Sequence, residues 1–340
     1  MKKEIAIHHR KRSYSDCWIE YCNENDIAYK VVDCFQPDII QQLRAVKGLL
    51  WHWHHEQAEE VLVARHILSA AEKMGLKVYP KISSCWHFDD KIAQKYLLES
   101  IGAPLVPTYI FYSLDEAVEW IENTTFPKVF KLRKGASAHN VRLVKSKIEA
   151  LKLAKKAFNR GFKPIAGYFG DFETKVKKKR PKGEFIETIK KMPQKIKKKY
   201  ESNKLIGRER GYIYFQDYIP ENKYDIRVVV IGKRIFAYTR NVRKGDFRAS
   251  GSGDFNFDQG RIIPGCIKTA YEAANKIGSQ SLAFDFVIDR SGEPKIIEIS
   301  YCFGTKGLNQ CPGYFDEEFV WHPEQIRAED AILIDFLDQL

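Results

Sequence analysis

Apolar and polar residues alternate over the first 88 positions, with a period that switches between that of strands and that of helices. Strands are expected at 4–9, 28–35, 48–55 and 76–79, and helices at 15–25, 37–46 and 56–74. Strands that alternate with helices in this way build a parallel sheet covered by helical layers. We therefore expect residues 1–88 to fold as a small parallel α/β domain.

Residues 89–168 predict a second unit of mixed helices and strands. Asp90 is a capping residue for a helix, and Ser113 with Glu116 three positions later has the spacing of a capping box. The turn at 134–140 is rich in small residues and follows Lys131, an arrangement that can clamp phosphate. The expected helices are 90–100, one that begins after Ser113, and 147–159, and the expected strands are 109–112, 127–132 and 141–144.

Residues 212–340 predict a third unit that is rich in strands. Its expected elements are a strand at 212–219, a hairpin of 224–231 with 234–240, a helix at 267–277, and a hairpin of 282–288 with 295–299. The three periodic regions together predict an α/β fold. The expected domains are 1–88, 89–168, a basic insertion at 169–211, and 212–340.

The last hairpin places two carboxylates opposite each other. If its turn centres on Ser291 and Gly292, Asp285 lies across from Glu298, and Ser300 shares their face. Opposed carboxylates repel each other, so they either face open water or hold a cation between them. Oxygen ligands of this kind suit a hard ion such as Mg²⁺. The opposite face is expected to be core and carries Leu282, Phe284, Phe286, Ile297 and Ile299.

The preceding hairpin presents cationic residues. Its register pairs Asp225 with Arg240 and puts Arg227 and Tyr238 on the same face. Arg248 follows in a segment that continues into a loop of small residues. Cationic side chains together with a metal ion are what phosphoryl transfer requires, because the charge on the transferred phosphate must be neutralised.

Composition narrows the class of protein and its compartment. An apolar content of 44% over 340 residues supports two or three packed domains, and seven cysteines without metal-ligand spacing fit a reducing cytosol. The first residues lack the pattern of a signal peptide, and no apolar run has the length of a membrane span, so we expect a cytoplasmic protein.

The positive charge is concentrated in one segment. Residues 172–210 contain 15 Lys or Arg against 5 Asp or Glu, which accounts for most of the net charge of +12. Such a segment is either a solvated insertion or a site for an anionic partner. Few aromatic residues are interleaved with the basic ones, which disfavours nucleic acid as the partner.

Two expected strands of the first domain end in histidine-rich segments, 8–10 and 51–55. In open parallel sheets, ligands bind beyond the carboxyl ends of the strands. These segments therefore either recognise a carboxylate or phosphate on a substrate or pack as aromatic residues against the next domain. A metal site at the histidines is a third and less favoured interpretation.

The ordered motifs over about 89–310 resemble the ATP-grasp superfamily, and within it the RimK-like and glutathione-synthetase-like ligases. Residues 1–88 resemble the pre-ATP-grasp domain that usually precedes this fold. The resemblance rests on Asp90-Lys91, Gly102-Ala103-Pro104 with Pro107-Thr108, PKVFKLRKGASAHNV, YFQDYIPENKYDIRVVVIGKRIFAYTRN, FRASGSG, and AFDFV with KIIEIS.

The resemblance implies a role for each matching residue. ATP phosphates would be bound by Lys91 and Lys131, the adenine by the hinge of Gln216, Asp217, Tyr218 and Ile219, and the ribose by Glu221 or Asp225. Arg240 would hold the γ-phosphate or an acyl-phosphate, with support from Arg227 and Arg248. Magnesium, as two ions, would be bound by Asp285 and Glu298, and Mn²⁺ is an alternative. Ser300 stands where the family usually has Asn, which weakens the expected second ion site.

The implied reaction is an ATP-dependent amide ligation through an acyl-phosphate, with ADP and phosphate as products. The expected partners are small-molecule or peptide carboxylates and amines of acidic character, and a homo-oligomer is left open. Two other classes compete with this interpretation. One is an ATP-grasp kinase of a hydroxyl acceptor, and the other is a nonenzymatic ATP-binding protein with an anionic partner.

Overall fold

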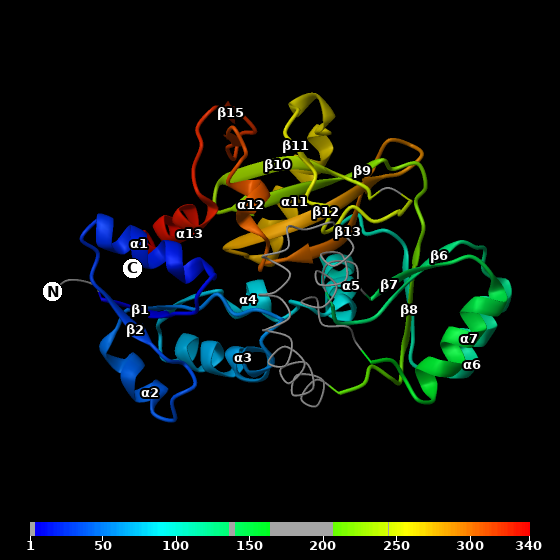
Figure 1. The fold of residues 1–340 in the computed structure, drawn as a ribbon, viewed down its shortest axis with the longest axis horizontal. Coiled ribbons are helices and arrows are strands. Elements are labelled where there is room, and N and C mark those ends of the chain that lie inside the picture. The colour runs from blue at the N-terminus through cyan, green and yellow to red at the C-terminus, as the bar shows by residue number, and fades with distance from the viewer. Residues whose placement is uncertain (1–3, 136–139, 164–206, 244) are drawn as a thin grey trace, which may run out of the picture.

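The computed structural model describes residues 4–135, 140–163, 207–243 and 245–340. These residues form three sheets (Figure 1). The basic insertion expected at 169–211 lies mostly outside the described residues, as do the small residues of the turn at 136–139. No helix within the described ranges is long and apolar enough to cross a membrane.

The first sheet is parallel, with the strand order β2-β1-β3-β4, as the alternating pattern predicted. Its strands are β1 (Ile5–His8), β2 (Tyr29–Val32), β3 (Gly48–Leu50) and β4 (Lys77–Tyr79). Its helices are α1 (Tyr14–Glu24), α2 (Ile39–Gln42), α3 (Ala58–Lys73) and α4 (Ile82–Cys85). Because β3 ends at Leu50, the histidine-rich residues 51–55 lie beyond the strand rather than within it.

The second sheet is antiparallel, with the order β5-β8-β6-β7, and we call this sheet with its helices the small lobe. Two helices, α6 (Leu114–Asn123) and α7 (Lys147–Phe158), pack with this sheet in a separate core that includes Phe130 and Phe215. The Ser113 hydroxyl makes no capping bond to α6, so the expected capping box is wrong. The strands are β5 (Thr108–Phe111), β6 (Lys128–Lys131), β7 (Val141–Val144) and β8 (Ile213–Asp217).

Strand β8 corrects the expected organisation. Its sequence position suggested that it belongs with residues 212–340, but it hydrogen-bonds to β5 and β6 of the small lobe. The apolar pattern of a single strand does not show which sheet it joins, because its hydrogen-bond partners are distant in sequence. We infer that the small lobe includes residues up to Asp217.

The third sheet has seven strands in the order β13-β12-β9-β10-β14-β15, with β11 paired to β10, and we call this sheet with its helices the large lobe. The strands are β9 (Tyr224–Ile231), β10 (Arg234–Asn241), β11 (Phe255–Asn256), β12 (Ser281–Ile288), β13 (Pro294–Ser300), β14 (Tyr314–Phe315) and β15 (Trp321–His322). The helices near this sheet are α5 (Lys91–Ser100), α11 (Pro264–Ile277), α12 (Thr305–Leu308) and α13 (Ala328–Leu337). As expected, Asp90 caps α5, and α11 ends at Ile277, where Gly278 takes a left-handed conformation.

One continuous core joins the first domain to the large sheet. The Trp18 ring of α1 packs edge-on against Tyr79, and its indole N–H donates to the carbonyl of Glu329 in α13. Figure 1 shows α13, the last helix of the chain, beside α1. The carboxyl ends of the first sheet are thereby held against the large lobe.

Both expected hairpin registers are confirmed, and one contains a bulge. Asp225 pairs with Arg240, and Asp285 pairs with Glu298. The register then shifts, so that Phe286 pairs with Ile296. A bulge reverses the alternation of side chains on the longer strand.

The bulge moves Ile297 out of the core, so its expected core position is wrong. Ile296 is fully buried instead, while Ile297 lines the cavity beside Glu298. The four other predicted core residues of this hairpin are buried, namely Leu282, Phe284, Phe286 and Ile299.

The bulge can be tested with two isoleucine substitutions at adjacent positions. We expect Ile296→Ala to lower the free energy of unfolding by about 2–5 kcal/mol, because it opens a cavity in the core. We expect Ile297→Ala to cost less than about 1.5 kcal/mol, because this side chain borders open space. Urea unfolding of both variants measures the difference, and equal losses would contradict the bulged register.

Candidate functional site

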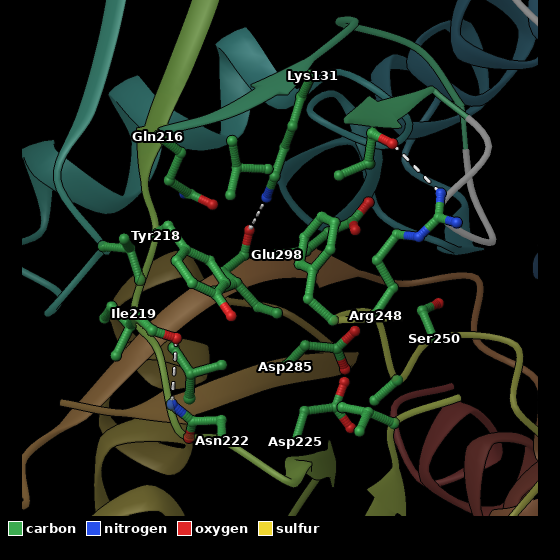
Figure 2. Close-up of a pocket in the computed structure, with 18 of the residues that line it drawn as sticks. Lys131, Gln216, Tyr218, Ile219, Asn222, Asp225, Arg248, Ser250, Asp285 and Glu298 are labelled. Carbon is green, nitrogen blue, oxygen red and sulfur yellow. Dashed lines mark hydrogen bonds between the residues drawn. The ribbon is translucent and has the colours of Figure 1, made fainter. Parts of the chain in front are cut away.

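A cavity of about 110 Å³ lies between the small-lobe sheet and the large sheet. Its walls come from β6 and β8 on one side and from β9, β12 and β13 on the other. Figure 2 shows these side chains converging from both sheets. The residues expected at the site that line the cavity are Lys131, Gln216, Asp217, Tyr218, Ile219, Asp225, Arg248, Asp285 and Glu298.

Asp285 is 5% exposed at the cavity wall and is held by two arginines. Arg227 donates to both of its oxygens, from Nε to Oδ1 over 2.7 Å and from Nη2 to Oδ2 over 2.8 Å. Arg240 Nη2 lies 2.8 Å from Oδ2. Burial opposes ionisation of Asp285, but Arg227 and Arg240 outweigh it and hold the pKa well below its ordinary value. Asp285 is therefore a fixed anion at neutral pH.

Arg240 connects Asp285 to a second buried acid, Asp225. Its Nε donates to Asp225 Oδ1 over 2.8 Å, which confirms the ion pair expected from the register. Arg240 and Arg227 are absent from the cavity wall, because their guanidinium groups are engaged by Asp225 and Asp285. Arg240 was expected to hold phosphate with support from Arg227, and in the structure both guanidinium groups contact Asp285.

Glu298 is the more open of the two opposed acids, with its side chain 32% exposed. Lys91 Nζ lies 3.1 Å from Glu298 Oε1 and donates to the Gly135 carbonyl over 2.7 Å. Lys91 is 3% exposed and does not line the cavity. Lys91 is therefore connected to the site indirectly, by its ion pair with Glu298 and its hydrogen bond to Gly135.

Lys131 extends from β6 into the cavity (Figure 2). Its Nζ donates to the carbonyl of Ile297 over 3.3 Å, across the gap between the lobes. Burial, with help from the charge of Lys91, lowers the pKa of Lys131 to about 8, although Glu298 and Asp285 oppose the shift. The ammonium group is thus poorly compensated and is suited to accept an anionic ligand.

The end of β8 forms one wall of the cavity. Asp217 pairs through its side chain with Lys128 Nζ over 2.6 Å, while Tyr218 packs edge-on against Phe247 with ring centroids 5.8 Å apart. Gln216 is 2% exposed and is hydrogen-bonded to Thr108. Glu221 does not line the cavity.

Sequence reasoning missed Asn222 at this wall. Its side-chain amide accepts from the Ile288 N–H over 2.9 Å and donates to the Ile288 carbonyl over 3.0 Å, as a paired strand would. It thereby fixes the turn after the hinge to the end of β12. The sequence offered only a weak signal, an Asn shortly after a Pro, which is common in turns.

Arg248 closes one side of the cavity. Its Nε and Nη2 donate to Asp246, at 2.9 Å and 2.7 Å, and its Nη1 donates to the Val141 carbonyl of β7 over 3.3 Å. The hydrogen bond to Val141 crosses from the large lobe to the small lobe (Figure 2). The segment with Phe247 and Arg248 therefore bridges the two sheets over the cavity.

Ser300 is turned away from the other predicted metal ligands. Its hydroxyl donates to the carbonyl of Cys302 over 2.9 Å, and it does not line the cavity. The strand register is consistent with Ser300 lying on the same face as the two acids. Its hydroxyl, however, is directed toward Cys302 and not toward the cavity. The register alone does not determine the rotamer of a short polar side chain.

The histidine-rich segment after β3 packs largely as aromatic residues. Trp51 and Trp53 are fully buried, and Trp53 contacts the Tyr301 ring of the large lobe. The side chain of His52 lies 3.0 Å from Cys302 Sγ. This segment therefore joins the first domain to the large lobe, as one of the alternatives predicted.

The next three residues, His54, His55 and Glu56, are half-buried and could offer metal-ligand atoms within 4.8 Å of one another. The structure thus leaves the metal interpretation of the histidines open at this group, although the residues before it are used for packing.

Comparison with known proteins supports the fold. The family model of the RimK-like ATP-grasp domain matches residues 183–314. No curated protein sequence matches the chain.

Solved structures match nearly the whole chain. A RimK domain ATP-grasp protein from Sphaerobacter thermophilus aligns with 98% of this chain and 99% of its own length, at 14% identity and a TM-score of 0.57. D-alanine–D-alanine ligase from Bacillus anthracis complexed with ATP aligns with 100% and 98%, at 12% identity and a TM-score of 0.59. A biotin carboxylase from Campylobacter jejuni aligns with 98% and 71%, at 14% identity and a TM-score of 0.56.

The fold is therefore shared with these proteins, while identities this low carry no statement about substrates. The family match covers residues 183–314, and the structural matches extend the likeness in fold to nearly the whole length of the chain.

Proposed function

We propose that the protein is an ATP-dependent carboxylate–amine ligase that works through an acyl-phosphate. The observation that carries this proposal is the convergence of Lys131, Arg248, Asp285 and Glu298 on one cavity beside the β8 hinge. Two acids can hold a hard cation, and two cationic side chains can neutralise phosphate. The D-alanine–D-alanine ligase with the same fold is described as complexed with ATP, which supports a nucleotide in this cavity.

The base of the nucleotide is assigned to the apolar end of the cavity. Val106, Val129 and Val287 line this region together with the hinge. Backbone groups of Asp217 and Ile219 are assigned to the edge of adenine. Of the two ribose candidates, Glu221 lies off the cavity wall and Asp225 is engaged by Arg240, so Asp225 acts mainly through that ion pair.

Asp285 and Glu298 fit a magnesium site. Asp285 Oδ1 accepts one hydrogen bond, from Arg227, and a carboxylate oxygen has capacity for a second interaction. Glu298 is partly exposed at the same wall. Bound there, Mg²⁺ would neutralise charge on the phosphates. Mn²⁺ suits the same oxygen ligands, and because Ser300 is turned away, a second ion would depend on Glu298, phosphate and water.

The residues of the chain then have distinct roles in the reaction. Lys131 and Arg248 hold the phosphates, while Arg227 and Arg240 keep Asp285 ionised and oriented. A substrate carboxylate oxygen attacks the γ-phosphorus, and the bond to ADP breaks. An amine nitrogen then attacks the acyl carbon, phosphate leaves and the amine loses a proton. The bridge from Arg248 to Val141 restricts water, which would hydrolyse the acyl-phosphate.

The substrates are proposed only by class, as an acid and an amine that are small molecules or peptides. Two alternatives remain distinguishable by experiment. A kinase would phosphorylate a hydroxyl acceptor with no amine present, and a binding protein would turn over no nucleotide. The ligase is favoured because the solved structures that share this fold include a D-alanine–D-alanine ligase.

ADP release over paired libraries of acids and amines tests the reaction class. We expect release only when a carboxylate and an amine are both present with MgATP, because the acyl-phosphate needs an amine to complete the cycle. A coupled ADP assay with mass spectrometry of the products measures this. Phosphorylated product without amine would indicate the kinase instead.

A charge-removing substitution tests the assignment of Glu298. We expect Glu298→Gln to lower kcat at least about 100-fold, because a neutral amide binds a divalent cation poorly and leaves phosphate charge uncompensated. The matched control is Glu293→Gln, an exposed acid in the turn of the same hairpin, which should leave kcat within about twofold. Equal activities of the two variants would refute the role of Glu298.

The pKa of Lys131, lowered to about 8, predicts a pH dependence of nucleotide binding. The side chain is charged below this value, and bound phosphate stabilises the charged form. The affinity for ATP should therefore fall as pH rises from 8 to 9.5, by roughly one order of magnitude. Isothermal titration calorimetry measures this fall.

Lys131→Arg provides the control for this pH dependence, because arginine stays charged throughout the range. Its affinity should change less than about threefold between the same two pH values. A wild-type affinity that does not vary over this range would contradict the assignment of Lys131 to the phosphates.

A further inference from the structure

The cavity contains a buried amide whose orientation is determined by its neighbours. Gln216 and Thr108 face each other across β8 and β5, and they are 2% and 8% exposed. Gln216 Nε2 donates to Thr108 Oγ1 over 3.0 Å. Figure 2 shows Gln216 extending from β8 into the cavity, with its oxygen on the side of Lys131.

The direction of the hydrogen bonds explains this orientation. The Thr108 hydroxyl has a single proton and donates it to the carbonyl of Val106 over 2.7 Å. A carbonyl oxygen can only accept, so this proton is committed and Oγ1 must accept from Gln216. The amide nitrogen therefore points to Thr108, and the carbonyl Oε1 points to the cavity. A flipped amide would leave two acceptors facing each other, at the cost of a lost hydrogen bond.

We propose that Thr108 is a positioning residue that selects the nucleobase through Gln216. This inference rests on the proposed function for the presence of a nucleotide in the cavity. Gln216 Oε1 is an acceptor, so it pairs with the 6-amino group of adenine and opposes the 6-keto group of hypoxanthine or guanine. The neighbouring lining residues Val106 and Val129 are apolar and offer no side-chain donor to a keto oxygen. A buried acceptor left facing another acceptor lowers affinity by about tenfold or more.

The hinge acid does not perform this selection through its side chain. The Asp217 carboxylate is held by Lys128 at 2.6 Å, and the Asp217 N–H donates to the Pro107 carbonyl over 2.9 Å. Gln216 thus differs from Asp217, because its amide oxygen has no such partner among the described residues and is turned toward the cavity.

Direct binding of ATP and inosine triphosphate tests the inference. The two nucleotides carry amino and keto groups at position 6, and binding needs neither acid nor amine substrate. Isothermal titration calorimetry should show that the wild-type protein binds ATP at least about tenfold more tightly than inosine triphosphate. In Thr108→Val the amide is free to flip, so the ratio should fall to within about threefold.

Three further variants separate positioning from a structural effect. Thr108→Ser keeps the hydroxyl and should retain the wild-type ratio. Gln216→Met removes both ends of the amide with little change in volume and should lower the ratio as Thr108→Val does, even if the valine variant is poorly folded. Thr125→Val, a threonine substitution at an exposed position, should leave the ratio unchanged.

The outcomes that overturn the inference differ from those that overturn the proposed function. Equal wild-type affinity for the two nucleotides would refute base selection by Gln216 while keeping the nucleotide site. A Thr108→Val variant that loses affinity for both nucleotides equally would show that Thr108 is only structural. Binding of neither nucleotide would refute the proposed function and the inference together.

Discussion

The structure of the site depends on a buried network of four charges, in which Arg240 links Asp225 to Asp285 and Arg227 pairs with Asp285. These residues come from three neighbouring strands, β9, β10 and β12. A carboxylate buried in a sheet is costly unless it is paired, and removing one partner of a buried pair typically costs about 3–5 kcal/mol. The network therefore ties the ionisation and orientation of Asp285 to the correct register of the sheet.

Three contacts of cationic side chains end at residues that line the cavity, and those of Lys131 and Arg248 join the two lobes. Lys91 reaches Glu298, Lys131 reaches the Ile297 carbonyl, and Arg248 reaches the Val141 carbonyl. Every one of these contacts uses a cationic side chain, and two of the three acceptors are backbone carbonyls. A bound polyphosphate offers stronger acceptors to the same cations. The contacts that bring the lobes together are thus suited to be replaced by a ligand.

The two hairpins were predictable because their registers follow from local information. Turn residues and period-two alternation placed Asp285 opposite Glu298 and Asp225 opposite Arg240. The partner of β8 was not predictable, since a single apolar strand contains no signal for which distant strand it joins. The contact of Lys91 with Glu298 could not be predicted either, because more than 200 positions separate the two residues in the sequence.

The amino-acid pattern alone established the parallel first domain, the two hairpins, the opposed acids and the resemblance to ATP-grasp proteins. Tertiary structure alone decided which side chains reach the cavity. The bulge exchanges Ile296 and Ile297 between core and cavity, the arginines turn toward Asp285, and Ser300 bonds to Cys302. Alternation along a strand assigns a face to each residue. Bulges, rotamers and ion pairs depend on the packing of segments that are far apart in the chain.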